Sequence, residues 1–183
     1  ATRQRAAWAI SMIGTKESVM ALQTYLDDSD AEVRYQAARA FEVAMPEAMS
    51  KDVAKRAADD AQDPRVRVKL IGALQLHGDP KLARETLMSI LESKAPDAVR
   101  ERAVYGLTRL VGEKDVKPLL KAIDREVDPY VTARLAFTLN KLTGYAQNAE
   151  QIGKTQPGER GDYIKKWQEA PKVEEKKTAA VSQ

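Results

Sequence analysis

Apolar and small residues recur along this chain in a single pattern that is repeated four times. The copies are AEVRYQAARAF (31–41), PRVRVKLIGAL (64–74), DAVRERAVYGL (97–107) and PYVTARLAFTL (129–139), and their valines fall at 33, 66, 99 and 131. Within each copy the apolar or small positions follow i, i+4, i+7 and i+8, which is one face of an α-helix. A fifth, degraded copy opens the chain at residues 2–10, with Arg3 in the position of Arg34. A fixed period of about 33 residues indicates a stacked array of repeats.

A second amphipathic segment follows each copy, so the repeating unit is predicted to be helix, short turn, helix. Asp63-Pro64, Asp79-Pro80 and Asp128-Pro129 place a capping carboxylate before a first-turn proline, and Asp30 and Asp97 supply the carboxylate elsewhere. Glycine is expected to end most first helices in the left-handed conformation, at positions 14, 78, 112 and 144. The second helices are predicted over residues 16–28, 50–61, 79–93 and 114–127. Alternating runs typical of β-strands are not found in the sequence.

These elements predict an all-α fold, a right-handed α-solenoid of about four to five two-helix repeats over residues 1–144. Residues 145–170 are predicted to form an irregular loop and a C-terminal capping helix, in which Tyr163 and Trp167 cover the last repeat. Residues 171–183 are poor in apolar side chains and are expected to be a disordered tail. The array begins within a repeat. We therefore expect either that the chain is part of a longer protein or that another element covers Trp8 and Ile10.

The pattern D-x-x-V-R-x-x-A-x-x-A-L-x-x-x-G resembles the HEAT-like repeat of bacterial proteins, the group that includes phycobilin lyases. The resemblance covers residues 1–144 and implies a structural ladder of Asp/Arg pairs along the stack. The implied pairs are Asp30 with Arg34, Asp63 with Arg67, and Asp97 with Arg100. The fourth copy has Thr132 in the arginine position, so the ladder is expected to break there.

Candidate catalytic and metal-binding residues are few in this chain. It contains no Cys and one His, which excludes thiol chemistry and sites built on a pair of histidines. His77 lies in a turn between two predicted helices and is interpreted as a solvated residue, because a general base needs a partner within reach. We therefore predict no cofactor, no metal and no catalytic residue.

Two acidic clusters and one tripeptide have structural interpretations that we favour. Residues 27–30 and 59–63 lack the calcium-loop pattern and recur between repeats, so they are predicted to be helix caps. Arg160-Gly161-Asp162 matches an integrin-binding tripeptide, but three residues match easily by chance, and Asp162 is predicted to cap the last helix.

The second helices carry the candidate partner-binding cations, and in the arrays that this chain resembles these helices line the concave face. The candidates are Lys55, Arg56, Arg84, Lys117 and Lys121. Acidic residues are interleaved with them in comparable number, and the net charge is only +3, so no stripe of positive potential is expected. This mixed surface suits a protein partner better than nucleic acid. Exposed aromatic candidates are Tyr35, Tyr105 and Tyr130 on first helices, for which packing between repeats is the favoured interpretation.

The sequence favours a non-enzymatic protein-interaction or scaffold module that binds a protein on the concave face. One alternative is an accessory or lyase-like subunit of an enzyme system, and a less favoured one is a nucleic-acid-binding protein. The N-terminus lacks a signal-peptide core and the sequence has no run long enough for a membrane span, so we expect a soluble protein. Its compartment and partner stay open, and we expect a monomer or a part of a longer chain.

Overall fold

The computed structural model describes residues 2–170, which form eleven α-helices and three short 3-10 helices without a strand among them. The predicted tail, residues 171–183, lies outside the described residues. In chain order the α-helices are α1 (Thr2–Ser11), α2 (Lys16–Ala21), α3 (Ala31–Ala44), α4 (Ser50–Ala58), α5 (Pro64–His77), α6 (Pro80–Glu92), α7 (Asp97–Leu107), α8 (Val116–Arg125), α9 (Pro129–Thr143), α10 (Ala149–Gly153) and α11 (Gly161–Gln168). The 3-10 helices are η1 (Gln23–Asp27), η2 (Glu47–Met49) and η3 (Glu113–Asp115).

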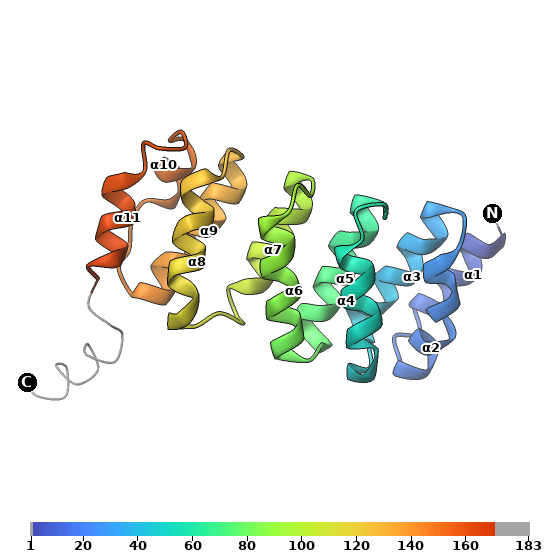
Figure 1. Cartoon of the computed structure of the whole chain (residues 1–183). Helices are drawn as coiled ribbons and strands as arrows, with labels where there is room; N and C mark the ends of the chain where they lie inside the picture. Colours follow the sequence, from blue (N-terminus) through green and yellow to red (C-terminus); the bar gives the residue numbers. More distant parts are fainter. Residues whose placement is uncertain (1, 171–183) are drawn as a thin grey trace, which may run out of the picture. The chain divides into compact units, whose positions relative to one another are not determined.

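The helices follow one another as first and second members of repeats, as Figure 1 shows, and the all-α repeat fold is confirmed. The first helices are α1, α3, α5, α7 and α9, and each is followed by at least one second helix. The chain divides into two compact units between Gly106 and Leu107, here called unit 1 and unit 2. The right-handed sense of the solenoid stays a prediction.

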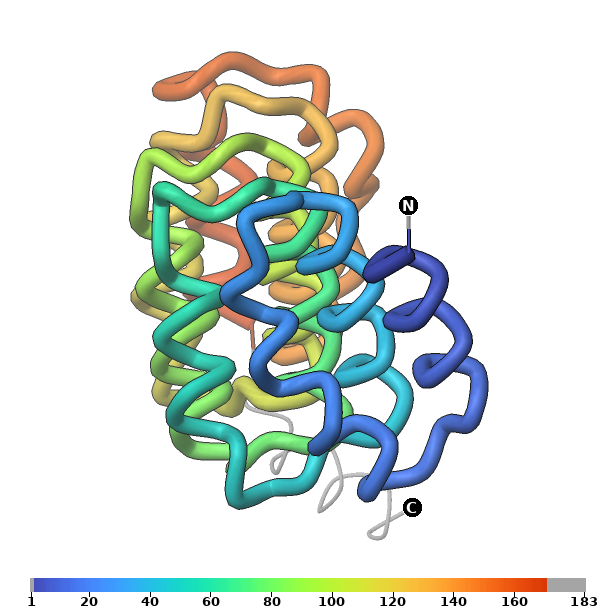
Figure 2. Tube along the Cα trace, turned by 90° about the vertical axis from the view of Figure 1, so that its right-hand side faces the viewer, coloured from blue at the N-terminus to red at the C-terminus, as the bar shows by residue number. Residues whose placement is uncertain are grey.

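Within unit 1 the helices form two layers. The first helices α1, α3 and α5 pack side by side, and α4 packs against both α5 and α6. Figure 2 shows α1 and α3 on one side of this unit and α2 and α4 on the other. The core between the layers contains the repeated valines, Val33 and Val66, which are completely or almost completely buried. The helical face read from the sequence therefore faces the core.

The predicted aspartate caps are present in the structure at four helices. Asp30 accepts a hydrogen bond from the Glu32 backbone at 2.8 Å, and Asp63, Asp79 and Asp128 cap α5, α6 and α9 in the same way. Asp97 instead lies inside α7, as its first residue. A cap lowers the free energy of the helix because it satisfies a backbone N–H that has no partner within the helix.

Two of the four glycines predicted to stop first helices adopt the left-handed conformation. Gly14 and Gly144 have φ values of +68° and +64°. Gly78 has a φ of −79° with an extended ψ, and Gly112 is also extended, so the prediction is wrong for these two. The chain leaves α5 directly in an extended conformation, because Asp79 begins the next helix at once.

The arginines of the predicted structural ladder bind carbonyl oxygens at the ends of preceding second helices. Arg34 donates to the carbonyls of Asp28 and Ser29 at 2.7 and 3.2 Å. Arg67, only 1% exposed, donates to the Ala57 carbonyl at 2.9 Å and to the Asp60 carboxylate at 2.8 Å. The last carbonyls of a helix lack partners within it and attract cations, so these contacts stabilise the junction between repeats.

The implied Asp/Arg pairing is therefore wrong for two of its three pairs. The Asp30 and Asp63 carboxylates are used as helix caps, and Arg34 and Arg67 bind other groups. Only the third pair forms as expected: Arg100 donates to Asp97 at 2.7 Å. It also donates to the Ala95 carbonyl at 2.6 Å, in the turn after α6, so it too follows the carbonyl-binding arrangement.

In the fourth copy, where Thr132 replaces the ladder arginine, an arginine from the C-terminal segment binds the end of the preceding second helix. Thr132 is buried and donates to the Asp128 carbonyl of its own helix. Arg160, which is 0% exposed, donates to the carbonyls of Ile123 and Glu126 at the end of α8. Burial lowers the pKa of its guanidinium from the ordinary value. A residue about 30 positions downstream thus takes the role that the fourth copy lost.

The C-terminal segment packs on the last repeat through Trp167. Its ring is buried, and its indole N–H donates to the Asn140 side chain of α9 at 2.9 Å. Tyr163, the other predicted capping residue, is half-buried, and its carbonyl accepts from Gln147. Two details differ from expectation: α10 interrupts the predicted loop, and Asp162 is an exposed first-turn residue of α11 rather than its cap.

A shared carboxylate joins three successive first helices. Glu42 on α3 accepts from Lys69 on α5 at 2.9 Å and from Arg102 on α7 at 2.8 Å. The ion pair between Glu42 of α3 and Arg102 of α7 lies over Gly72 of α5, where an added Cβ would overlap with both side chains. Gly72 therefore makes room for an ion pair between repeats that are not neighbours in the sequence.

Removing the Arg67 side chain is expected to destabilise the array. Arg67→Ala should lower the free energy of unfolding by about 2–4 kcal/mol, because the Ala57 carbonyl loses its buried donor. Denaturant unfolding measures the change. The control is Arg65→Ala, which removes a mostly exposed arginine next to it and should cost at most about 1 kcal/mol. Equal effects of the two substitutions would contradict a structural role of Arg67.

Replacing Gly72 tests the ion pair that crosses it. Alanine at a helical glycine normally stabilises a protein by about 0.5–1 kcal/mol. We expect this gain from Gly72→Ala only in a Glu42→Ala/Arg102→Ala background, where neither of the two side chains occupies the space above residue 72. In the wild-type background the substitution should give no gain. Unfolding of the four proteins yields the coupling energy, and a coupling of zero would show that Gly72 does not serve the Glu42 contacts.

Candidate functional site

The second helices of unit 1 present an exposed surface of mixed charge. On α4, Lys51 and Lys55 lie one turn apart, and on α6 Lys81 lies one turn from Glu85. All four side chains are exposed. In the described part of the chain, none of these three lysines forms a hydrogen bond or an ion pair. Their ammonium groups are therefore open to a ligand.

Two of the five predicted partner-binding cations are engaged within the chain. Arg56 donates to Asp52 of its own helix at 3.0 Å and to Asp27 of η1, also at 3.0 Å. The hydrogen bonds to Asp27 raise the pKa of Arg56 and lower the pKa of Asp27 from their ordinary values. Arg84 is half-buried and interacts with another residue. Arg56 thus links α4 to η1. Binding of a partner by Arg56 and Arg84 stays a prediction.

Unit 2 contains the remaining two predicted cations. Lys117 and Lys121 lie one turn apart on α8, and both are exposed. Asp124 and Arg125 are exposed further along the same helix. Unit 2 thus has a second-helix surface of its own with mixed charge, in which the two lysines share one face.

The three candidate tyrosines differ in their surroundings. Tyr35 is half-buried, with the Arg65 guanidinium 5.6 Å from its ring centre. Tyr105 is exposed beside Arg102, whose guanidinium lies 5.1 Å from the ring centre. Tyr130 is among the most exposed large side chains, so packing between repeats is the wrong interpretation for it. Arginines over the rings of Tyr35 and Tyr105 form cation–π contacts that fix these rings.

A row of exposed apolar side chains was missed by the sequence analysis. Met12, Val43 and Leu76 occupy the same repeat position, near the ends of α1, α3 and α5, and all three are exposed. The signal was present in the sequence, because this position lies outside the i, i+4, i+7, i+8 face and yet is apolar in three consecutive copies.

The residues with possible catalytic or metal-binding chemistry have structural roles. The Nε2 atom of His77 lies 3.0 Å from the Glu42 carbonyl of the neighbouring first helix. In the acidic clusters, Asp28 pairs with Arg3 and Asp60 pairs with Arg67. Among residues 2–170, no group of three or more potential metal ligands comes together. The buried Arg160 is inaccessible, so the tripeptide that it begins is not a recognition motif.

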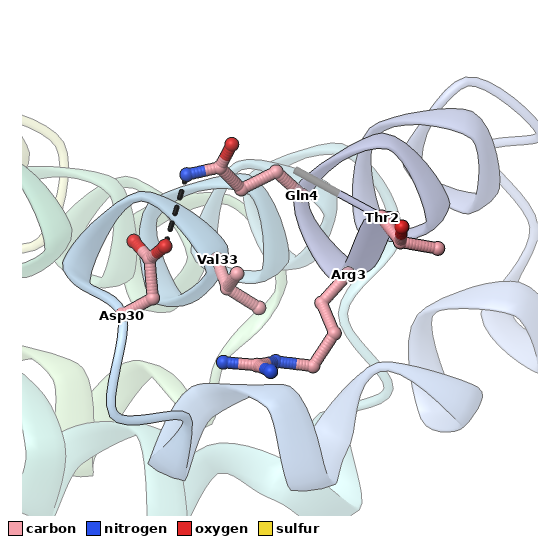
Figure 3. A pocket seen from close by; sticks show the side chains of 5 residues that line it. All are labelled: Thr2, Arg3, Gln4, Asp30 and Val33. Atoms are coloured by element: carbon pink, nitrogen blue, oxygen red, sulfur yellow. Dashed lines mark hydrogen bonds between the residues drawn. The ribbon is translucent and has the colours of Figure 1, made fainter.

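A small open hollow lies where α1 meets the start of α3. Figure 3 shows its lining, which is Thr2, Arg3, Gln4, Asp30 and Val33. The Gln4 amide donates to the Asp30 carboxylate at 3.0 Å, and Arg3 donates to Asp28 at 2.8 Å. The charged and amide groups of this hollow thus bind one another or a neighbouring side chain, and they connect α1 to the turn before α3.

Comparison with known proteins gives one family. A search of curated proteins finds no match to this chain. None of the described helices has the length and apolar character needed to cross a membrane. The family description "HEAT repeats" matches residues 1–67 and 51–140, which together cover most of the chain, from α1 into α9. HEAT repeats are commonly protein-interaction scaffolds and typically lack enzymatic activity. With its repeated helix pairs and this match over residues 1–140, the chain belongs to the HEAT-repeat family.

Proposed function

We propose that this chain is a non-enzymatic protein-interaction module whose second helices bind a protein partner. The binding surface in unit 1 consists of the exposed lysines of α4 and α6 together with their acidic neighbours. Unit 2 contributes a comparable surface on α8, around Lys117 and Lys121. This surface is the one expected from the sequence, except that Arg56 and Arg84 are left out because both already interact within the chain.

The observation that carries this proposal is a division between the two kinds of cation. Arginines such as Arg34, Arg56 and Arg67 are engaged in contacts between repeats. The lysines of the second helices at positions 51, 55 and 81 are exposed and form no hydrogen bond or ion pair within the described part of the chain. An arginine fork suits fixed bidentate contacts, whereas a lysine is a flexible point charge that can adapt to a partner. The surface charge is therefore available for association.

The mixed sign of this surface favours a protein over nucleic acid. Affinity for a phosphate backbone needs cations gathered without compensating acids. Here Glu85 lies one turn from Lys81, and Asp59 lies one turn from Lys55, and all of these side chains are exposed. Alternating charges of this kind give specificity toward a partner with the opposite arrangement. An accessory lyase would need a polar pocket on this surface, and the hollow of Figure 3 lies elsewhere, between α1 and α3.

Charge reversal on the second helices tests the proposal. In the triple variant Lys51→Glu/Lys55→Glu/Lys81→Glu, we expect the helical circular dichroism signal to stay intact, because these exposed lysines form no ion pair. Capture of the protein partner from an extract of the source cells should be lost, as measured by affinity purification and quantitative mass spectrometry.

The matched control replaces the same three lysines with arginine and should retain capture. If the triple glutamate variant captures the same proteins in the same amounts, the second helices of unit 1 are not the binding surface. The same experiment with Lys117→Glu/Lys121→Glu tests unit 2 separately.

A further inference from the structure

The first-helix side of unit 1 carries an apolar row that faces solvent. Met12, Val43 and Leu76 are 60, 55 and 50% exposed, and Trp8, one turn before Met12 on the same face of α1, is 50% exposed. Because α3 has a first helix on each side, the exposure of Val43 is not an effect of the end of the array. Exposed apolar residues are common singly, but an aligned row over three packed helices is typical of a binding surface.

Two arginines without internal partners lie beside this row. Arg5 precedes Trp8 by one turn of α1, and Arg39 precedes Val43 by one turn of α3. Among residues 2–106, every other arginine interacts with another residue, whereas these two form neither a hydrogen bond nor an ion pair. Glu42, which precedes Val43 on α3, already accepts from both Lys69 and Arg102. The stripe, defined here as Arg5, Trp8, Met12, Arg39, Val43 and Leu76, is therefore apolar and positively charged without internal compensation.

The spacing of the row restricts what can cover it. Packed helices lie about 8–10 Å apart, so an occupant that crosses α1, α3 and α5 meets an apolar side chain about every 10 Å. An α-helix advances about 10 Å in seven residues, which returns a side chain to nearly the same face. A β-strand advances about 10 Å in three residues, which places the next matching side chain on its opposite face. A helix fits the row, and a strand does not.

We infer that this stripe docks an acidic amphipathic helix of another protein, with an apolar residue at about every seventh position. The apolar residues of the docked helix cover Met12, Val43 and Leu76. Carboxylates on one flank of that helix reach Arg39, one turn before Val43, and Arg5, two turns before Met12. The stripe lies on the layer opposite to the lysines of the second helices, so this interaction is additional to the proposed function and does not depend on it.

A synthetic peptide of three heptads tests the inference with the full chain. The probe has Leu at every seventh position flanked by Glu, and a fluorescent label at one end reports binding by anisotropy. We expect saturable binding with a blue shift of the Trp8 emission, and the Trp8→Phe variant identifies that signal. A second peptide, with Lys in place of each Glu, should bind about tenfold more weakly or worse.

Variants of the chain locate the binding site. Val43→Ser/Leu76→Ser and Arg5→Gln/Arg39→Gln should each weaken binding of the acidic peptide by about tenfold or more. These positions are exposed or without internal polar partners, so circular dichroism should be unchanged. The matched control is Lys94→Gln/Lys114→Gln, two exposed lysines outside the stripe and outside α4, α6 and α8, which should leave the affinity as it is.

Three outcomes would overturn the inference. They are no binding of the acidic peptide, binding that the stripe variants do not alter, and stronger stripe-dependent binding to phosphatidylserine vesicles or duplex DNA than to the peptide. None of these results bears on the second helices, whose charge-reversal test uses different residues and a different readout.

Discussion

The contact on which this structure depends joins an arginine guanidinium to the carbonyl oxygens at the end of a second helix. Those carbonyls have no partner inside the helix, and burial between repeats would leave them without water as well. From the helix that follows, Arg67 donates to a carbonyl in the last turn of α4, and Arg34 and Arg100 donate to carbonyls just after η1 and in the turn after α6. Arg160 donates to the carbonyls at the end of α8. The first three arginines thus fix a repeat to the next by a charged hydrogen bond, in addition to the apolar core, and Arg160 fixes the C-terminal segment to α8 in the same way.

This use of arginine determines which groups remain at the surface. The guanidinium groups at the junctions donate hydrogen bonds to carbonyls and carboxylates. Arg56 and Arg102 form ion pairs between helices of different repeats. What remains on the second helices is lysine and acid, and what remains on the first helices of unit 1 is an apolar row with two arginines. The two layers of the unit therefore have different chemistry, although both derive from the same repeating sequence.

Much of the fold follows from local sequence signals. The 33-residue period, the i, i+4, i+7, i+8 face and the aspartates before Pro64, Pro80 and Pro129 predict the helices and their starts, because burial and capping are decided within one or two turns. The ladder pairing fails for a related reason. The Asp30 carboxylate accepts a hydrogen bond from the Glu32 backbone N–H, and Arg34 donates to the Asp28 carbonyl instead.

Other features depend on contacts between distant residues. Nothing near Arg160 indicates that it reaches α8, although the missing arginine at Thr132 shows that a partner is needed there. The Glu42 contact with Arg102 spans 60 positions and is visible only once α3, α5 and α7 are arranged in space. The candidate cations were identified by type and helical position, and these do not distinguish Lys55, which stays at the surface, from Arg56, which is held by Asp27.

Hydrogen exchange of the Arg160→Met variant tests the role of the arginine contacts most directly. Methionine keeps much of the apolar bulk and removes every donor, so the carbonyls of Ile123 and Glu126 lose their buried partner. We predict that the amides in the last turn of α8 and in α11 exchange about tenfold faster or more, while those of α3–α6 keep their protection. Unchanged exchange in α8 and α11 would contradict the claim that an arginine bound to the carbonyls after a second helix holds the neighbouring element in place.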